Sequence, residues 1–317
     1  MEKPGNQEWL NRYLDSLATQ RKLAEHTVAN YRRDLAELMQ LAEAAKPALS
    51  LEALDHFHIR KFAAQLHAQG LSGGSIARKL SAWRGFYAWL AQQTTLPANP
   101  VEGIKPPKRA KLLPKALSAD DAVRLVNQPN PRKDANATSE LCNRAMFELL
   151  YSSGLRISEL VQLDVRYAKE NGHESAGWID FDAGEVTVTG KGGKMRRVPV
   201  GGAAMQALAA WIAVRPALEK LDPHALFLTE RGTRMSARLV QLRIKAHAKA
   251  LGIPADVHPH MMRHSFASHV LQSSGDLRAV QEMLGHASIA ATQIYTALDF
   301  QRLAQVYDAA HPRAKKK

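Results

Sequence analysis

One tyrosine near the end of this chain follows a series of basic residues that together suit an attack on a phosphodiester. In chain order the set is Arg156, Lys191, His260, Arg263, His286 and Tyr295. A tyrosine hydroxyl has a pKa of about 10, so it is neutral near physiological pH and must lose its proton to attack phosphorus. The leaving oxygen must gain a proton, and the charge that develops on the phosphoryl oxygens needs fixed cations or donors.

Each of these tasks favours a particular residue type. Arginine binds two phosphate oxygens through its planar guanidinium and stays protonated near neutrality, which suits Arg156 and Arg263. Histidine has a pKa of about 6.5 and suits proton exchange. Lys191 lies in a glycine-rich turn and could protonate a leaving oxygen. Taken alone, each residue is also typical of an ordinary surface, turn or packing position. The prediction of phosphodiester chemistry therefore depends on the whole set. With arginines supplying the charge, the chemistry requires no metal and no cofactor.

The histidines also raise the possibility of a metal site. His260 and His264 are four residues apart and could chelate zinc, with His258 and His269 nearby. A zinc protease motif would place Glu directly after the first histidine, where Met261 stands, and the chain has no cluster of cysteines. The sequence therefore favours the phosphodiester chemistry over a metal centre.

The charge balance points to a polyanionic partner. The chain has 317 residues, a formal net charge of +13 and a pI near 9.9, which favours nucleic acid before membrane, although charge alone could also serve solubility. Its one cysteine, Cys142, excludes an intrachain disulfide and lies in an apolar pattern that predicts burial. We find no signal pattern and no apolar run long enough to span a bilayer, so we expect a cytoplasmic protein.

The first third of the chain predicts a bundle of four helices. Apolar residues recur at helical spacing over 7–19, 26–41, 55–70 and 72–90. Asp55 is expected to cap the third helix, with Phe57 among the residues that face inward. On the fourth helix, Arg78 and Lys79 either contact phosphates or are solvated charges on an amphipathic helix.

A basic, proline-rich segment separates this bundle from the rest of the chain. Prolines disfavour regular structure there, and residues 105–115 contain basic residues and no acid. We expect a helical DNA-binding domain over 1–104, a linker over 105–117 and a catalytic domain over 118–317.

The second domain predicts helices around a small sheet. Strands are expected at 178–181, 185–189 and 195–200, after a polar insertion at about 166–177 that reads as a surface loop. Helices are expected before the sheet and again after Gly202, almost to the end of the chain. The fold class is therefore mainly α with a small antiparallel β-sheet.

The ordered motifs closely resemble those of the tyrosine recombinases, the phage integrase family, and of its Xer subfamily in particular. The resemblance covers nearly the whole chain and includes the segments around Arg156, Lys191, His260-x-x-Arg263, Leu284-Gly285-His286 and Tyr295. It implies an N-terminal four-helix SAM-like core-binding domain and an α+β catalytic domain. It also strengthens the prediction that the six residues act together on a phosphodiester, because each motif alone is a weak signal.

The resemblance also implies a role for each residue of the set. Tyr295 would attack the scissile phosphate to form a 3′-phosphotyrosyl link and release a 5′-hydroxyl. Arg156 and Arg263 would hold the phosphate, Lys191 would protonate the leaving 5′-oxygen, and His260 would act in acid–base exchange. The sixth residue, His286, would donate a hydrogen bond to the phosphate.

The partners implied by the resemblance are a short chromosomal recombination site in double-stranded DNA, a XerD-type recombinase in a heterotetramer and an FtsK-type DNA translocase. Together they would resolve chromosome dimers at cell division, through a Holliday junction. An apolar face of the C-terminal segment, formed by Phe300, Leu303 and Tyr307, is expected to dock on a neighbouring protomer or to pack on its own domain.

Two other readings stay open. A sequence-specific DNA-binding protein without catalysis fits the charge and the helices equally well, but binding alone needs no tyrosine at position 295. A phage-type integrase or an invertase fits the chemistry, although such proteins often carry an additional arm-binding segment before the helical bundle.

Overall fold

A computed structural model describes residues 4–19, 25–107, 116–131, 136–190, 193–254 and 256–285. Contacts within the chain divide it into two compact units, Met1–Lys111 and Leu112–Lys317. Each unit has its own hydrophobic core. The predicted linker at 105–117 falls around the division between the units, and its limits stay a prediction.

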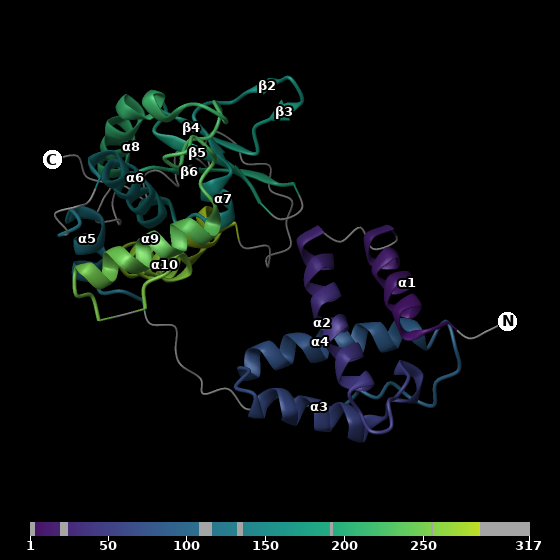
Figure 1. Ribbon diagram of the computed structural model, residues 1–317. Helices are drawn as coiled ribbons and strands as arrows, with labels where there is room; N and C mark the ends of the chain where they lie inside the picture. Colours follow the sequence, from purple (N-terminus) through teal and green to yellow (C-terminus); the bar gives the residue numbers. More distant parts are fainter. Residues whose placement is uncertain are drawn as a thin grey trace. The chain divides into compact units, whose positions relative to one another are not determined.

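The first unit is the expected helical bundle (Figure 1). Its elements are α1 (Asn6–Thr19), α2 (Glu25–Glu43), a 3₁₀ turn (Leu51–Ala53), α3 (His56–Ala68) and α4 (Gly73–Leu90). Asp55 and Ser72 cap α3 and α4 by accepting hydrogen bonds from the amides of His58 and Ser75. The start of each of these two helices therefore follows from a capping residue visible in the sequence.

Two expectations for this unit are wrong. Phe57 is 76% exposed, because it lies two residues before Ile59 and so points away from the buried face of α3. Lys79 was expected either to contact phosphates or to be solvated, but it is buried. Its ammonium lies 3.3 Å from the Asp34 carboxylate and also pairs with Glu37. Arg78 pairs with Asp34 as well. These charges tie α4 to α2.

The second unit consists of helices around a small sheet. The helices are α5 (Ala119–Asn127), α6 (Ala137–Ser153), α7 (Ile157–Val161), α8 (Gly202–Val214), α9 (Ala237–Ala250), α10 (Pro259–Ser274) and α11 (Leu277–Leu284), with a 3₁₀ turn at Arg215–Leu218. Cys142 is buried in α6 as expected, and burial raises the pKa of its thiol to about 12. Within the described ranges, no helix is long and apolar enough to cross a membrane.

The sheet contains the three expected strands and one more. Its order is β1-β4-β5-β6, with bounds Leu163–Asp164, Gly177–Asp180, Glu185–Thr189 and Met195–Pro199. The pairs β4–β5 and β5–β6 are antiparallel, as expected, whereas the short β1 runs parallel to β4. The sheet is therefore mixed, because a two-residue strand directly after α7 joins its edge.

The insertion at 166–177 contains a hairpin in place of the expected loop. Strands β2 (Lys169–Glu170) and β3 (His173–Glu174) pair across Asn171 and Gly172, which have φ values of 50° and 80°. Positive φ at both positions is the pattern of a tight two-residue turn, and Asn-Gly is its preferred sequence. Figure 1 shows this hairpin standing out from the sheet. His173 and Ser175 hold it to the domain through the buried carboxylate of Asp164.

Helix α10 also holds the described end of the interdomain segment. The backbone amide of Leu117 donates to Ser265 Oγ at 2.9 Å, and the carbonyl oxygen of Leu117 lies 3.1 Å from His269 Nε2. The Leu117 side chain is buried in the core of this unit. Both polar groups of its backbone are thus bound by one helix.

Candidate active site

A left-handed glycine places the first predicted arginine. Helix α6 ends at Gly154, whose φ of 59° closes the helix. A Cβ added to Gly154 would lie 2.4 Å from the ring of Phe266, so only glycine fits this contact. Two residues later Arg156 takes the capping position of α7. The glycine that ends α6 is visible in the sequence, and it places Arg156 at the start of a new helix.

A buried carboxylate holds the Arg156 side chain. Glu159 Oε1 accepts from Arg156 Nη1 at 2.8 Å, and its Oε2 accepts from the Arg156 backbone amide at 2.8 Å. Arg196, on β6, donates to the same two oxygens, with both distances 2.8 Å. Burial raises the pKa of the Glu159 carboxyl, but the hydrogen bonds and charge of Arg196, together with those of Arg156, outweigh burial and lower it. The carboxylate stays ionised and supports the arginines.

The second predicted arginine, Arg263, joins the same cluster from α10. It is 8% exposed, and its Nη1 donates to the carbonyl oxygen of Gly154 at 2.6 Å. Burial and the neighbouring charge of Arg156 lower its pKa to about 10, so it stays protonated near neutrality. Three guanidinium groups and one carboxylate leave two positive charges in excess (three minus one), a balance that suits an anionic ligand such as a phosphate.

The three arginines all bind the C-terminal end of α11. Arg196 Nε donates to the carbonyl of Met283 at 3.0 Å, Arg263 Nη2 to that of Leu284 at 2.6 Å, and Arg156 Nη2 to that of Gly285 at 3.2 Å. Gly285 ends the helix with a φ of 62°. The carboxyl end of a helix carries partial negative charge and favours cations. The cluster thereby fixes the backbone directly before His286.

His260 lies in the first turn of α10, one turn before Arg263. Residues three apart share a helix face, so both side chains come from the same side of α10. His260 is exposed, whereas His258 caps the helix by accepting from the Met261 amide at 3.2 Å. His269 is buried, 3.0 Å from the Tyr151 hydroxyl. In the part of the chain that the structure describes, no group of histidine, cysteine and acidic residues could hold a metal ion.

The structure thus brings Arg156 and Arg263 together and puts His260 one turn from Arg263. Lys191, His286 and Tyr295 lie outside the described residues, as do Phe300, Leu303 and Tyr307 of the expected docking face. For Lys191 the description extends to its neighbours. Gly190 donates to the carbonyl of Lys194 at 2.8 Å and so begins the turn between β5 and β6.

Sequence reasoning missed Arg196. Over the first four residues of β6 exposed and buried positions alternate, and Arg196 stands at a buried position between the exposed Met195 and Arg197. A charged residue that faces inward from a strand needs a buried partner. The signal available in the sequence was that Arg196 lies two and four residues before Val198 and Val200, on the same face of the strand, although this did not identify Glu159 as the partner.

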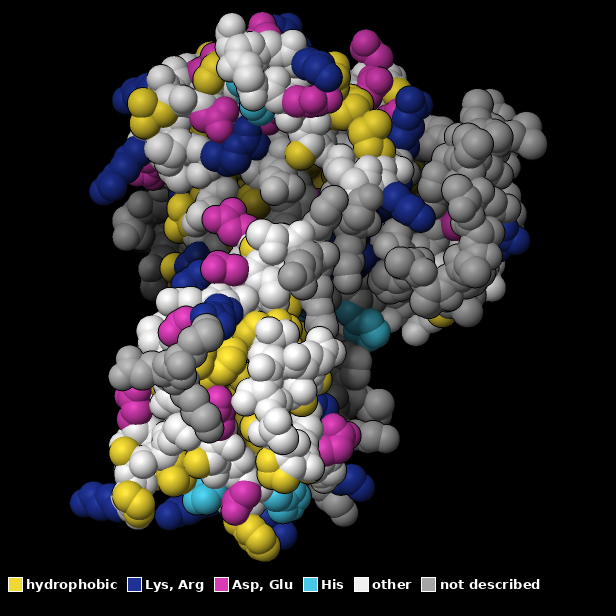
Figure 2. All heavy atoms as spheres, turned by 90° about the vertical axis from the view of Figure 1, so that its right-hand side faces the viewer, with side chains coloured by type: hydrophobic (Ala, Val, Ile, Leu, Met, Phe, Trp, Pro, Cys, Tyr) yellow, Lys and Arg dark blue, Asp and Glu magenta, His cyan; other side chains and the backbone are white. Residues whose placement is uncertain are grey.

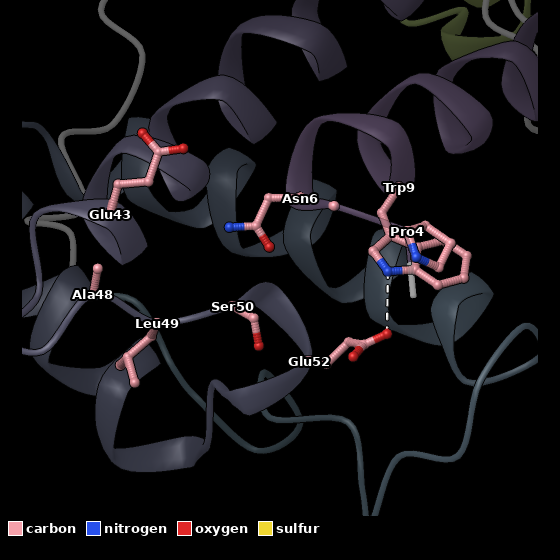
Figure 3. Close-up of a pocket in the computed structure, with 9 residues that line it drawn as sticks. Pro4, Asn6, Trp9, Glu43, Ala48, Leu49, Ser50 and Glu52 are labelled. Atoms are coloured by element: carbon pink, nitrogen blue, oxygen red, sulfur yellow. Dashed lines mark hydrogen bonds between the residues drawn. The ribbon is translucent and has the colours of Figure 1, made fainter. Parts of the chain in front are cut away.

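A hollow in the first unit is a poorer candidate. It has a volume of about 370 Å³ and is lined by residues that include Trp9, Glu43, Leu49 and Glu52. Figure 3 shows the Trp9 indole directed at Glu52, to which it donates at 3.1 Å. Two carboxylates and no basic group disfavour a phosphate there.

Comparisons with known proteins match both units. The phage integrase family model matches residues 115–302, and a model of the phage integrase N-terminal SAM-like domain matches 10–94. A relative from Ralstonia nicotianae, named tyrosine recombinase XerC 1, is 58% identical and the match covers 96% of this chain and 93% of the relative. Tyrosine recombinase XerC of Chromobacterium violaceum is 47% identical, with 98% and 96% covered.

Solved structures share the fold. A lambda integrase dimer bound to a core site matches with a TM-score of 0.67 at 18% identity, over 92% of this chain and 99% of that one. XerH site-specific recombinase bound to its difH substrate matches with a TM-score of 0.64 at 22% identity, over 96% and 84%. These matches show the shared fold, and the family models and close relatives show that the chain belongs to the phage integrase family and is a tyrosine recombinase, an enzyme of DNA strand exchange.

Proposed function

We propose that the chain cuts and rejoins DNA at a specific site through a 3′-phosphotyrosyl intermediate, with Tyr295 as the nucleophile. The Tyr295 oxygen bonds to phosphorus while the bond from phosphorus to the 5′-oxygen breaks. His260 takes part in removing the tyrosine proton, and Lys191 protonates the leaving 5′-oxygen. A 5′-hydroxyl of another strand then attacks the phosphotyrosine and releases the enzyme. The bond energy is conserved in the link, so the exchange needs no ATP.

One observation carries the proposal: Arg156 and Arg263 donate to the adjacent carbonyls of Gly285 and Leu284, immediately before His286 in the chain. Residues more than a hundred positions apart are thereby gathered around an excess of positive charge. Fixed cations of this kind stabilise the charge of a phosphoryl transition state without the cost of reorganisation. His286 adds a hydrogen bond to the phosphate in this scheme.

A covalent-capture experiment tests the nucleophile. A duplex bound by the protein is first selected from a random library and then nicked near the expected cleavage position, so that the released fragment diffuses away. We expect a protein–DNA band in a denaturing gel for the wild type and none for Tyr295→Phe. The matched control is Tyr167→Phe, which removes the same hydroxyl from a residue that is 49% exposed and lies on the β2–β3 insertion.

The control should form the adduct at the wild-type rate. An undiminished adduct with Tyr295→Phe would contradict the assignment of the nucleophile. Site-specific binding by the wild type without any adduct would favour the alternative of a DNA-binding protein without catalysis.

We further propose that the chain acts with a XerD-type recombinase, under an FtsK-type translocase, to resolve chromosome dimers in the cytoplasm. The XerC names of its close relatives support this role. On a DNA with two different half-sites, a mixture of both recombinases should bind cooperatively and form Holliday junctions. The proposal fails if this chain alone produces the same yield of junctions. Deletion of residues 299–317 should weaken the cooperativity if the C-terminal segment docks on a neighbour.

The viewed face carries both signs of charge. Figure 2 shows Lys and Arg side chains interspersed with Asp and Glu over the described parts of that face. The net charge of +13 is therefore not gathered there into one patch. The salt dependence of DNA binding is set by the number of phosphates that basic residues contact, and not by the net charge of the chain.

A further inference from the structure

We infer that Arg196 is a positioning residue for DNA cleavage. It fixes the segments that carry Arg156, Lys191 and His286 relative to one another. The inference rests on the proposed function of those three residues. It concerns a buried side chain that does not itself touch the reacting atoms. Three sets of contacts support it.

The first contact is with the carboxylate that orients Arg156. Arg196 and Glu159 form a two-pronged pair in which both side chains are almost fully buried, at 5% and 4% exposure. The same carboxylate binds the backbone amide and the guanidinium of Arg156. Two parallel hydrogen bonds fix the plane of the carboxylate as well as its position. Arg196 therefore determines where Glu159 can hold Arg156.

The second contact is with the backbone that leads into His286. Arg196 Nε donates to the carbonyl of Met283 at 3.0 Å. A Cβ built on Gly285 would lie 3.0–3.2 Å from the Arg196 side chain, so this glycine packs directly on the guanidinium. Since Gly285 also has a φ of 62°, the end of α11 is fitted to the arginine beneath it.

The third contact is with the backbone that leads into Lys191. A Cβ built on Gly190 would lie 3.6 Å from Arg196 Nη1. One guanidinium thus packs against the residue before His286, lies near the residue before Lys191 and binds the carboxylate that holds Arg156.

The test compares two substitutions of Arg196 with a matched control. Arg196→Met removes the charge and all the donors. Arg196→Lys keeps a positive charge beside Glu159, and so avoids leaving a buried carboxylate unpaired, but one ammonium cannot reproduce the planar fork. The control is Arg197→Met, one residue further along β6, where the arginine is 66% exposed and also pairs with a buried carboxylate, Glu185, at 3.4 Å.

Cleavage is measured as single-turnover formation of the covalent adduct, with DNA affinity and thermal unfolding measured in parallel. Displacement of catalytic groups by about 1 Å lowers rates on the order of 100-fold, and we expect a loss of that size for Arg196→Met. Arg196→Lys should lose less, while both variants bind DNA as the wild type does. Arg197→Met should cleave at the wild-type rate.

A second substrate separates positioning from stability. In it sulfur replaces the bridging 5′-oxygen, and because a thiol has a pKa of only about 8.5 the leaving group needs little protonation. The deficit of the Arg196 variants should shrink on this DNA, as that of Lys191→Ala should, since the step assisted by Lys191 is bypassed. A part should persist, because Arg156 and His286 are also displaced.

Three results would overturn the inference: wild-type cleavage by folded Arg196→Lys and Arg196→Met, a deficit equal on the oxygen and sulfur substrates, or a deficit explained by the unfolded fraction at the assay temperature. Failure of the proposed function would look different. The wild type would then form no adduct, or Lys191→Ala would cleave both substrates as the wild type does.

Discussion

Replacing Gly154 by alanine should destabilise the catalytic unit more than the same change at Gly275. Both glycines end helices with similar left-handed φ values, 59° for Gly154 and 66° for Gly275. The added Cβ at Gly154 would lie 2.4 Å from the Phe266 ring, whereas nothing lies within 4 Å at Gly275. The pair therefore separates steric overlap from backbone strain.

The expected size follows from these two contributions. An L-residue with left-handed φ costs about 1–2 kcal/mol, and this applies at both positions. Displacing the fully buried Phe266 adds about 1–3 kcal/mol at Gly154 alone. The Gly154→Ala variant should thus lose about 2–5 kcal/mol of unfolding free energy. For a unit of this size that corresponds to a fall in Tm of roughly 4–20 °C.

Calorimetry of the full chain measures the effect, with the transition of the catalytic unit assigned by hydrogen exchange of α6. The Gly275→Ala variant should shift this transition by roughly 2–8 °C, the backbone contribution alone. Equal shifts for the two variants would refute the reasoning, because the Phe266 contact would then carry no energy. DNA cleavage should fall further in Gly154→Ala, since the Gly154 carbonyl accepts from Arg263.

Three further outcomes are expected. Lys79→Met should destabilise the first unit by about 1–3 kcal/mol in thermal unfolding, because it removes one of the two cations that pair with buried Asp34, whereas the exposed control Lys61→Met should change little. Burial lowers the pKa of His269 below its ordinary value of 6.5. The neutral imidazole therefore stabilises the fold above pH 6.5, and this contribution is lost as the pH falls toward the pKa of the folded state. The His269→Gln variant should show a smaller decline in unfolding free energy between pH 7 and pH 5. The buried Cys142, whose thiol pKa is raised to about 12, should resist a thiol reagent in the native protein and react after denaturation, and rapid native modification would contradict its burial.

Local signals predicted the elements well. The caps at Asp55 and Ser72 and the apolar spacing that follows them define α3 and α4, because the interactions that start a helix lie within a few residues. Alternation and turn glycines identified β5 and β6 for the same reason. The parallel strand β1 was missed, since two residues carry no pattern and its partner β4 lies beyond the β2–β3 insertion.

The site could be predicted only in part. The motifs identified Arg156 and Arg263 as a pair, and the structure brings both to the end of α11. Arg196 supports this pair through Glu159, which lies 37 residues earlier in the chain. Whether Arg196 or its neighbour Arg197 meets Glu159 is not visible in the sequence. Such a contact is decided by the packing of the sheet against α7 and α11, and the sequence near either residue does not contain it. The same holds for Lys79, whose partners lie on another helix.

The binding of Leu117 by Ser265 and His269 has a consequence for protein engineering. One helix binds both the amide and the carbonyl of Leu117, and the side chain of Leu117 is buried in the core of the catalytic unit. A chimera that joins this unit to a foreign DNA-binding module should therefore change sequence before residue 117. Insertions on the N-terminal side of that junction leave both hydrogen bonds of Leu117 in place, whereas a shift of Leu117 itself would displace the helix that carries His260 and Arg263.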